Sequence, residues 1–201
     1  MMRVTKIRLS PEEKALVLDP GWILTKRSVM NKVAALLGEL ADQYRATTAG
    51  LETLAPPLKD GFPKLSRGEN YRGLPYMILD YPALFDRVDV FAVRTLFWWG
   101  HYFSITIHLK GQYLARYLPG LLGGLERSGG EGWHLAVSEE EWAHAVEEGN
   151  YTPYQALDGT QKAAMAGRPF FKMAWMIPLD RWDDLYEQLN NRFQETLEWM
   201  G

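Results

Sequence analysis

The sequence predicts an α+β fold in which an antiparallel sheet has helices packed on one face. Two amphipathic helical segments, residues 25–48 and 180–200, flank a central region of strand-like sequence. Strands joined by short connections pair antiparallel, and helices with one apolar stripe cover the apolar face of such a sheet. Three consecutive strands are expected at residues 74–81, 90–98 and 102–110.

The length and composition are those of a chain with one buried core. It has 201 residues, of which 47% are hydrophobic. A chain of this size can bury enough apolar surface to fold without disulfides or a metal. We therefore expect a single domain that spans residues 1–201.

Helix signals are strongest near the N-terminus. Ser10-Pro11-Glu12-Glu13 combines an N-cap serine, a proline at the first helical position and a glutamate at the third, and it predicts a short helix to about Asp19. The longer helix over 25–48 ends before Gly50. Residues 51–73 hold three prolines and are expected to form a long irregular connection, a kind of segment that often carries function.

The register of the central hairpin follows from its loop. A three-residue loop, Trp99-Gly100-His101, places Trp98 opposite Tyr102, whereas a two-residue loop would mix polar and apolar side chains on one face. With the longer loop the odd positions form one apolar face that should meet the helices: Phe91, Val93, Phe97, Phe103, Ile105, Ile107 and Leu109. The even positions form a face that is either a cleft roofed by residues 51–73 or a subunit interface: Ala92, Arg94, Leu96, Trp98, Tyr102, Ser104, Thr106 and His108.

The C-terminal half is expected to alternate helices and strands. Pro119-Gly120 and Gly123-Gly124 interrupt a helical pattern over 112–126, and they predict a break or a kink. Ser138-Glu139-Glu140-Glu141 is a second capping box, which predicts a helix to about Glu148. The remaining expected elements are a strand at 133–137, an irregular stretch at 151–159, a short helix at 160–166, a strand at 170–177 and the helix at 180–200.

Several classes of chemistry are excluded by what the sequence lacks. The chain has no cysteine, which removes disulfides, thiol nucleophiles and cysteine-based zinc sites. The four histidines show neither HxH nor HExxH spacing, and neither a GxSxG nor a GxxxxGK[ST] motif occurs. We therefore predict no metal and no cofactor. Nucleic acid is not an expected partner, because no stripe of lysine and arginine is present.

No membrane or export signal is predicted. The first residues, MMRVTKIRLSPEEK, contain basic residues but no following apolar run of the kind that a signal peptide has. No segment approaches the roughly 20 consecutive apolar residues that a membrane-spanning helix needs. We expect a soluble, cytoplasmic protein with no membrane partner.

Residues 66–73 are one candidate for ligand binding. They bring two arginines together with glycines and an asparagine, a mixture that could hold an anion through guanidinium and backbone N–H groups. Alternatively the segment is a structured loop in which Arg67 or Arg72 pairs with Glu69 or Asp80. The residues singled out here are Arg67, Glu69, Asn70, Tyr71 and Arg72.

The even-numbered face of the sheet is the second candidate. Arg94 lies inside a strand, so its charge needs either Asp80 on the preceding strand or a ligand carboxylate or phosphate. His108, beside Thr106, is the candidate catalytic acid or base, although a strand histidine that faces solvent or is hydrogen-bonded is the simpler interpretation. Three aromatics of these strands are candidate ligand contacts: Tyr76, Trp98 and Tyr102. Trp98-Trp99 with Tyr102 could stack on a base, a sugar or an aromatic cofactor, or pack as core or edge residues of the sheet.

Two functions are compatible with these residues. The first is a non-enzymatic binding or assembly protein, whose aromatic and arginine-lined sheet face takes a small anionic or aromatic ligand or a second copy of the chain. It predicts that Arg94 pairs with Asp80. The second is an enzyme on a small anionic substrate, with His108 as the acid or base and the arginines as an anion clamp; it predicts one concave pocket for all of them.

One stretch resembles a known group of sequences. Two segments are similar to sequences of a family of uncharacterised bacterial proteins of the Bacteroidetes type: SRGENYRGLPYMILDYP and FAVRTLFWWGHYFSITIHLKG. The likeness covers about residues 64–111, roughly a quarter of the chain. It implies a bacterial, cytoplasmic protein, and it implies neither an activity nor functional residues.

Overall fold

The computed structural model describes residues 7–201, which divide into two compact units. The first unit extends to Ala35, and the second runs from Leu36 to Gly201. The first holds α1 (Pro11–Leu18) and the beginning of α2 (Pro20–Ala49). The predicted capping box at Ser10 is confirmed, since the Ser10 hydroxyl accepts from Glu13 N and the Glu13 carboxylate accepts from Ser10 N.

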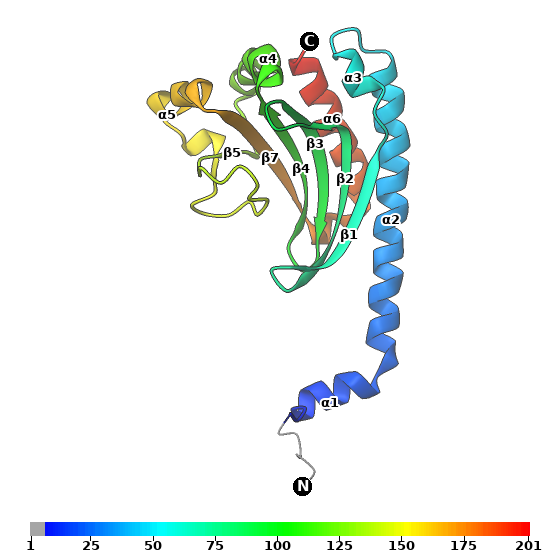
Figure 1. Cartoon of the computed structure of the whole chain (residues 1–201). Helices are drawn as coiled ribbons and strands as arrows, with labels where there is room; N and C mark the ends of the chain where they lie inside the picture. The colour runs from blue at the N-terminus through cyan, green and yellow to red at the C-terminus, as the bar shows by residue number, and fades with distance from the viewer. Residues whose placement is uncertain (1–6) are drawn as a thin grey trace. The chain divides into compact units, whose positions relative to one another are not determined.

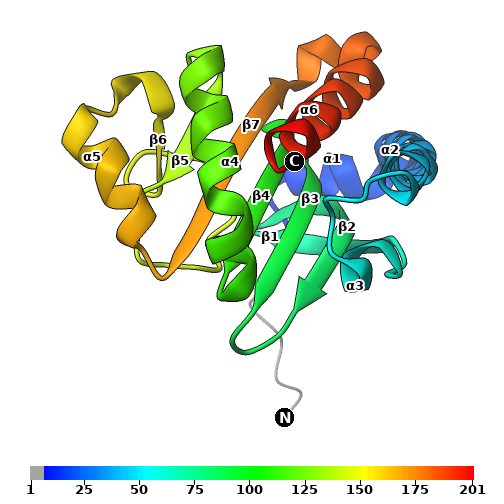
Figure 2. The same cartoon turned by 90° about the horizontal axis from the view of Figure 1, so that it is seen from above.

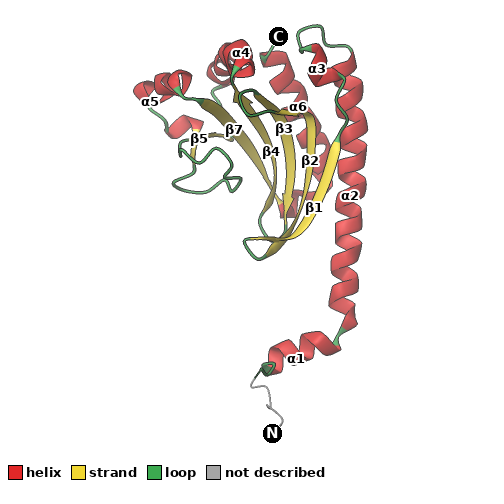
Figure 3. Cartoon of the chain, viewed as in Figure 1, coloured by secondary structure: helices red, strands yellow, loops and turns green. Residues whose placement is uncertain are grey.

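The second unit is built on a seven-stranded antiparallel sheet, which confirms the predicted α+β class (Figures 1 and 3). The strand order is β1-β2-β3-β4-β7-β5-β6. The strands are β1 (Lys64–Tyr71), β2 (Leu74–Phe85), β3 (Val90–Trp98), β4 (Tyr102–Lys110), β5 (Trp133–Ala136), β6 (Tyr151–Pro153) and β7 (Phe170–Pro178). The helices are the end of α2, α3 (Pro56–Lys59), α4 (Gln112–Ser128), α5 (Gly159–Ala164) and α6 (Leu185–Trp199), with 3₁₀ turns at Tyr154–Ala156, Met165–Gly167 and Leu179–Asp184.

Helices α4 and α6 and the end of α2 pack on one face of this sheet, and α4 and α6 lie on the same side of it in Figure 2. The predicted hairpin register is confirmed, with Trp98 opposite Tyr102. The odd-numbered side chains are buried beneath the helices, and the Phe91 ring meets the Tyr117 ring of α4 edge to face at 5.5 Å. On the same side the Tyr44 ring stacks on Phe193 of α6 at 3.7 Å. These contacts form the apolar core.

The predicted break in the helix at 112–126 is wrong, because α4 continues through Pro119 and the glycines to Ser128. The alternative of a kink at Pro119 stays a prediction. The glycines serve packing instead. A Cβ on Gly124 would lie 2.1 Å from Cδ2 of Trp199, and one on Gly120 would lie 2.1 Å from the Trp199 carbonyl oxygen. Only glycine at these two positions allows α6 to approach α4 so closely.

The predicted irregular connection at 51–73 is also wrong. It contains α3 and the edge strand β1, which turns into β2 at Arg72-Gly73. Both turn residues have positive φ, 52° and 84°, the conformation of a tight two-residue hairpin. The long connection that the sheet does have lies elsewhere, at residues 137–150.

No helix forms over 138–148, so that prediction is wrong too (Figure 3). The Ser138 hydroxyl donates to Oδ1 of Asn150 instead of capping a helix, and the Glu141 carboxylate accepts from Nζ of Lys110 at 2.8 Å. Residues 137–150, here named the covering segment, pass over the even-numbered side chains of the sheet. Within the described residues no helix has the length and apolar character to cross a membrane.

Candidate functional site

Arg94 and Asp80 form a two-pronged ion pair on the even-numbered face. They are direct cross-strand neighbours on β3 and β2, and Nε and Nη2 of Arg94 donate to the two carboxylate oxygens at 2.7 and 2.9 Å. The third nitrogen, Nη1, lies 3.0 Å from Nε2 of His144 in the covering segment. Asp80 is 6% exposed. The alternative in which Arg94 pairs with Asp80 is therefore confirmed.

Cationic side chains of the sheet, and one that precedes β7, hold the covering segment in place. Lys172 on β7 is 3% exposed, and its Nζ donates to the carbonyl oxygens of Glu141 at 2.9 Å and Ala143 at 2.6 Å. Lys110 adds an ion pair to the Glu141 carboxylate. Arg168 donates to the carbonyl oxygens of Val137 and Ser138. An irregular backbone has no internal partners for its carbonyls, so these donors supply the hydrogen bonds that a helix would have made.

His108 is buried under the same segment, with Nε2 at 3.2 Å from Oε1 of Glu141. The two atoms are close, but their orientation does not make a hydrogen bond, and neither atom has another partner among the described residues. Burial, followed by the positive charges of Lys172, Arg94 and Lys110, lowers the pKa of His108 to about 3. The imidazole is neutral at pH 7.

His144 and Lys172 are shifted by the same causes. Burial and the nearby guanidinium of Arg94 lower the pKa of His144 to about 3, so the ring accepts from Arg94 as a neutral base. Burial and Arg94 also lower the pKa of Lys172 to about 8, and the Glu141 carboxylate opposes that shift. The face thus carries two neutral histidines among cations whose partners are protein atoms.

Arg94 and His108 do share a cavity, but it is very small. Its volume is about 10 Å³, which is room for one water molecule. The roof comes from the covering segment, and the predicted roof by residues 51–73 is wrong. The lining residues are Phe85, Ala92, Arg94, Thr106, His108, Trp142, His144 and Lys172.

Residues 66–73 lie at a different place and bind parts of the chain itself. Arg72 makes a two-pronged ion pair with Glu147 at 2.6 Å, so the prediction that it pairs with Glu69 or Asp80 is wrong. Oδ1 of Asn70 accepts from Gly73 N and closes the turn. Arg67 and Glu69 are exposed on the edge strand β1.

The three aromatics predicted as ligand contacts are in contact with protein groups. Trp98 meets the Tyr71 ring at 5.0 Å and donates from Nε1 to the Tyr71 carbonyl oxygen. The Tyr76 ring packs over Gly68, where a Cβ would lie 2.4 Å from Cε1 of the ring. The Tyr102 hydroxyl accepts from Val146 N in the covering segment. They form a packing cluster at the hairpin end of the sheet.

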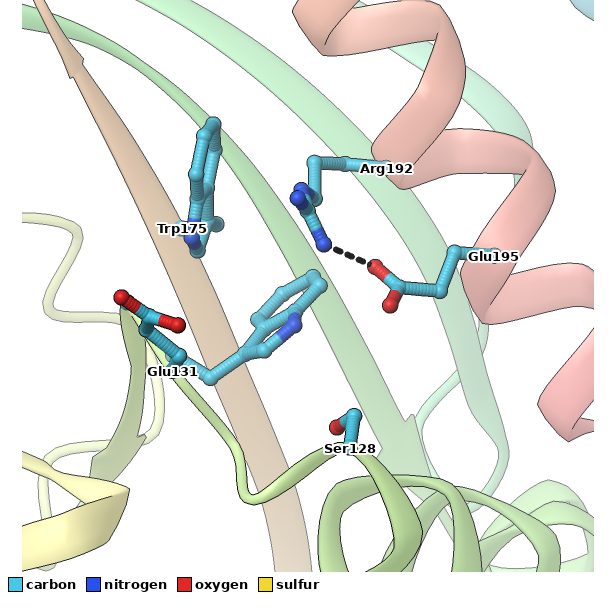
Figure 4. Close-up of a pocket in the computed structure, with 7 residues that line it drawn as sticks. Ser128, Glu131, Trp175, Arg192 and Glu195 are labelled. Carbon is cyan, nitrogen blue, oxygen red and sulfur yellow. Dashed lines mark hydrogen bonds and ion pairs between the residues drawn. The ribbon is translucent and has the colours of Figure 1, made fainter.

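A larger pocket opens on the helix side of the sheet, and it is here named the tryptophan pocket (Figure 4). Its volume is about 540 Å³. The Arg192 guanidinium lies over the Trp175 ring at 4.5 Å and is paired with Glu195, both from α6. Glu131 lies on the opposite side of the pocket from Glu195. The lining residues are Ser128, Glu131, Gly132, Trp133, Trp175, Arg192 and Glu195.

None of the tryptophan-pocket residues, and none of Glu141, His144 and Lys172, is among the functional residues predicted from the sequence. The pocket depends on the pairing of β5 with β7, which places Trp133 opposite Trp175 although they are far apart in the chain. The one local signal is the three-residue spacing of Arg192 and Glu195 on the final helix, which is common on solvated helices.

The comparisons add no family to these observations. No family model, no curated protein and no solved structure matches the chain. The resemblance over residues 64–111 therefore stays a prediction. Among residues 7–201, no three histidine or acidic side chains are grouped so that they could hold a metal ion.

Proposed function

We propose that the protein binds a small molecule without transforming it, and that the tryptophan pocket holds this ligand. The observation that carries the proposal is the contrast between the two candidate sites. The charged face has a cavity of about 10 Å³, whereas the tryptophan pocket has about 540 Å³. Hollows of 410–560 Å³ also occur elsewhere among the described residues, and the tryptophan pocket differs from them in placing an arginine and two carboxylates beside two indole rings. Pockets for small ligands commonly measure roughly 300–1,000 Å³.

The enzymatic alternative has less support. A general base works best when its pKa lies near the working pH. The pKa of His108 is lowered to about 3, and the cavity beside it has no room for a substrate. The Arg94 guanidinium is already bound to Asp80 and His144.

The lining of the tryptophan pocket favours a small zwitterion. Arg192 offers a planar guanidinium that can donate two hydrogen bonds to a ligand carboxylate. The ligand carboxylate would then replace the Glu195 carboxylate as the partner of Arg192. Glu131 and Glu195 offer acceptors for an ammonium group, and the Trp175 ring offers an aromatic surface. A free amino acid combines these three features, so we propose that ligand class.

The test is titration with the free amino acids, one at a time, followed by NMR of the indole N–H signals. The chain has eight tryptophans, and Trp175→Phe identifies the signal of Trp175. We expect at least one amino acid to shift that signal. Its affinity for the protein should fall at least tenfold in Arg192→Gln, and the amino acid should be recovered chemically unchanged after incubation with the protein.

Arg181→Gln is the matched control, because Arg181 makes the same kind of three-residue ion pair with Asp184 outside the pocket. Binding that is equally weakened by both variants would place the ligand elsewhere. If no amino acid shifts any indole signal, the proposed ligand class is wrong.

A further inference from the structure

The N-terminal unit exposes an unusual share of the apolar surface. Of the 14 large hydrophobic side chains that are exposed among the described residues, eight lie between residues 7 and 24. Helix α1 has no buried residue at all. The eight are Ile7, Leu9, Leu16, Val17, Leu18, Trp22, Ile23 and Leu24, each 43–88% exposed.

Four of these side chains line one hollow. The chain bends between α1 and α2 at Asp19. The Asp19 N–H donates to the carbonyl oxygens of Ala15 and Leu16 and so closes the last turn of α1. Its Oδ1 accepts from Gly21 N at 2.8 Å at the start of α2. The hollow at this bend has a volume of about 560 Å³. It is lined by Glu13, Leu16, Val17, Asp19, Pro20, Trp22 and Ile23.

We propose that this segment pairs antiparallel with the same segment of a second copy of the chain, about a two-fold axis at the Asp19–Pro20 bond. Positions equidistant from that bond are chemically complementary to each other. Leu16 corresponds to Ile23 and Val17 to Trp22, which places apolar on apolar side chains. A two-fold interface requires this self-complementarity, because each residue meets its counterpart twice.

The charges follow the same symmetry. Glu12 corresponds to Arg27, so each copy offers an acidic residue to a basic residue of the other. In the paired state α1 of one copy would lie along the first two turns of α2 in its partner. Opposite charges in this arrangement select the antiparallel orientation, since a parallel one would bring like charges together.

The available area is sufficient for a stable pair. The eight exposed side chains offer on the order of 800–1,000 Å² of apolar surface, and a standard interface takes about 800 Å² from each partner. A membrane surface is the other general use for an exposed apolar helix. The segment as a whole carries both signs of charge, but two carboxylates, those of Glu13 and Asp19, line the apolar hollow itself and disfavour its insertion into a bilayer.

The first measurement is the mass of the full chain in solution by sedimentation equilibrium, from about 1 to 100 µM. We expect twice the mass of one chain. In the double variant Trp22→Ser/Ile23→Ser the dissociation constant of the dimer should rise at least tenfold. Both side chains are exposed, so far-UV circular dichroism should be unchanged. The proposal is overturned by a monomer at every concentration, by a dimer that the two serines leave intact, or by a monomer that binds phosphatidylglycerol vesicles.

The second measurement tests the orientation. Glu12→Lys alone and Arg27→Glu alone should each weaken the dimer at least threefold, and the two together should restore it. The matched control combines Glu12→Lys with Lys32→Glu. Lys32 is exposed and lies on α2 like Arg27, but the proposed two-fold axis does not relate it to Glu12. If the control restores the dimer equally well, or the designed pair does not restore it, the antiparallel register is overturned.

Discussion

The two faces of the sheet are both buried, but by opposite chemistry. On the helix side the odd-numbered residues of β3 and β4 are apolar or, at Thr95, hydrogen-bonded to Tyr44. On the other side Asp80, His108 and Lys172 are buried with 6%, 6% and 3% exposure beneath an irregular segment. A helix satisfies its own backbone, so an apolar face suffices to hold it. An irregular segment has unpaired carbonyls, and the sheet meets them with cations.

This difference teaches how to interpret a charged residue within a strand. Arg94 resembles a ligand clamp in the sequence, but its partners are Asp80 and His144 of the same chain. Buried ion pairs contribute little net stability, yet the loss of one partner is costly because the other charge remains buried. The charged face therefore fixes the position of the covering segment more than it stabilises the fold.

The largest expected effect comes from breaking the central pair of the charged face. Arg94→Ala leaves the Asp80 carboxylate buried without its guanidinium. We expect the free energy of unfolding to fall by about 3–5 kcal/mol, measured by urea denaturation at pH 7.

Arg72→Ala is the matched control, because Arg72 also holds a carboxylate with two hydrogen bonds but is exposed. An exposed ion pair is screened by water, so the change in the free energy of unfolding on its removal should lie near the error of the measurement. Equal losses in the two variants would show that the covering segment does not shield Asp80 from solvent.

The same contrast explains what the sequence could predict. The strands at 74–81, 90–98, 102–110, 133–137 and 170–177, the hairpin register and the capping box at Ser10 depend on residues close together in the chain, and they are confirmed. The short strand β6 and the edge strand β1 were not predicted. The Arg94–Asp80 pair was also within reach, because the two strands are consecutive. The covering segment was not, since Glu141 bonds to Lys110 about thirty positions away and that contact outweighs its local helix signal.

A smaller effect is expected on the helix side. Gly124→Ala places a Cβ against the Trp199 ring, and the rigid ring and α6 must move. We expect the free energy of unfolding to fall by about 1–3 kcal/mol, the usual cost of overpacking a core, measured by the same denaturation.

Gly123→Ala is the control at the neighbouring position, where a Cβ meets only the flexible end of Arg127 at 3.1 Å. It should be neutral or stabilising, by up to about 1 kcal/mol of helix propensity, and a loss equal to that of Gly124→Ala would refute the packing explanation.

The smallest effect is a dependence on pH that belongs to the charged face alone. The folded-state pKa of His108 and of His144 is about 3, below the ordinary value of 6.5. The unfolded chain therefore binds more protons between these values, and stability falls as the pH falls from about 6.5 toward 3. Each histidine should account for about 1–2 kcal/mol between pH 7 and pH 5. The checks are the unfolding free energies of His108→Gln and His144→Gln, whose profiles over this range should be flatter than that of the parent chain.

Hydrogen exchange can assign this acid sensitivity to one face of the sheet. Because the protons enter beneath the covering segment, the amide of Val146, which donates to the Tyr102 hydroxyl, should lose protection at a higher pH than those of β3 and β4. The helix-side amides around Phe193 have no histidine beside them and should follow only global unfolding. If all amides lose protection together at pH 5, the two faces act as one cooperative unit. The covering segment would then be an integral part of the core and could not open separately.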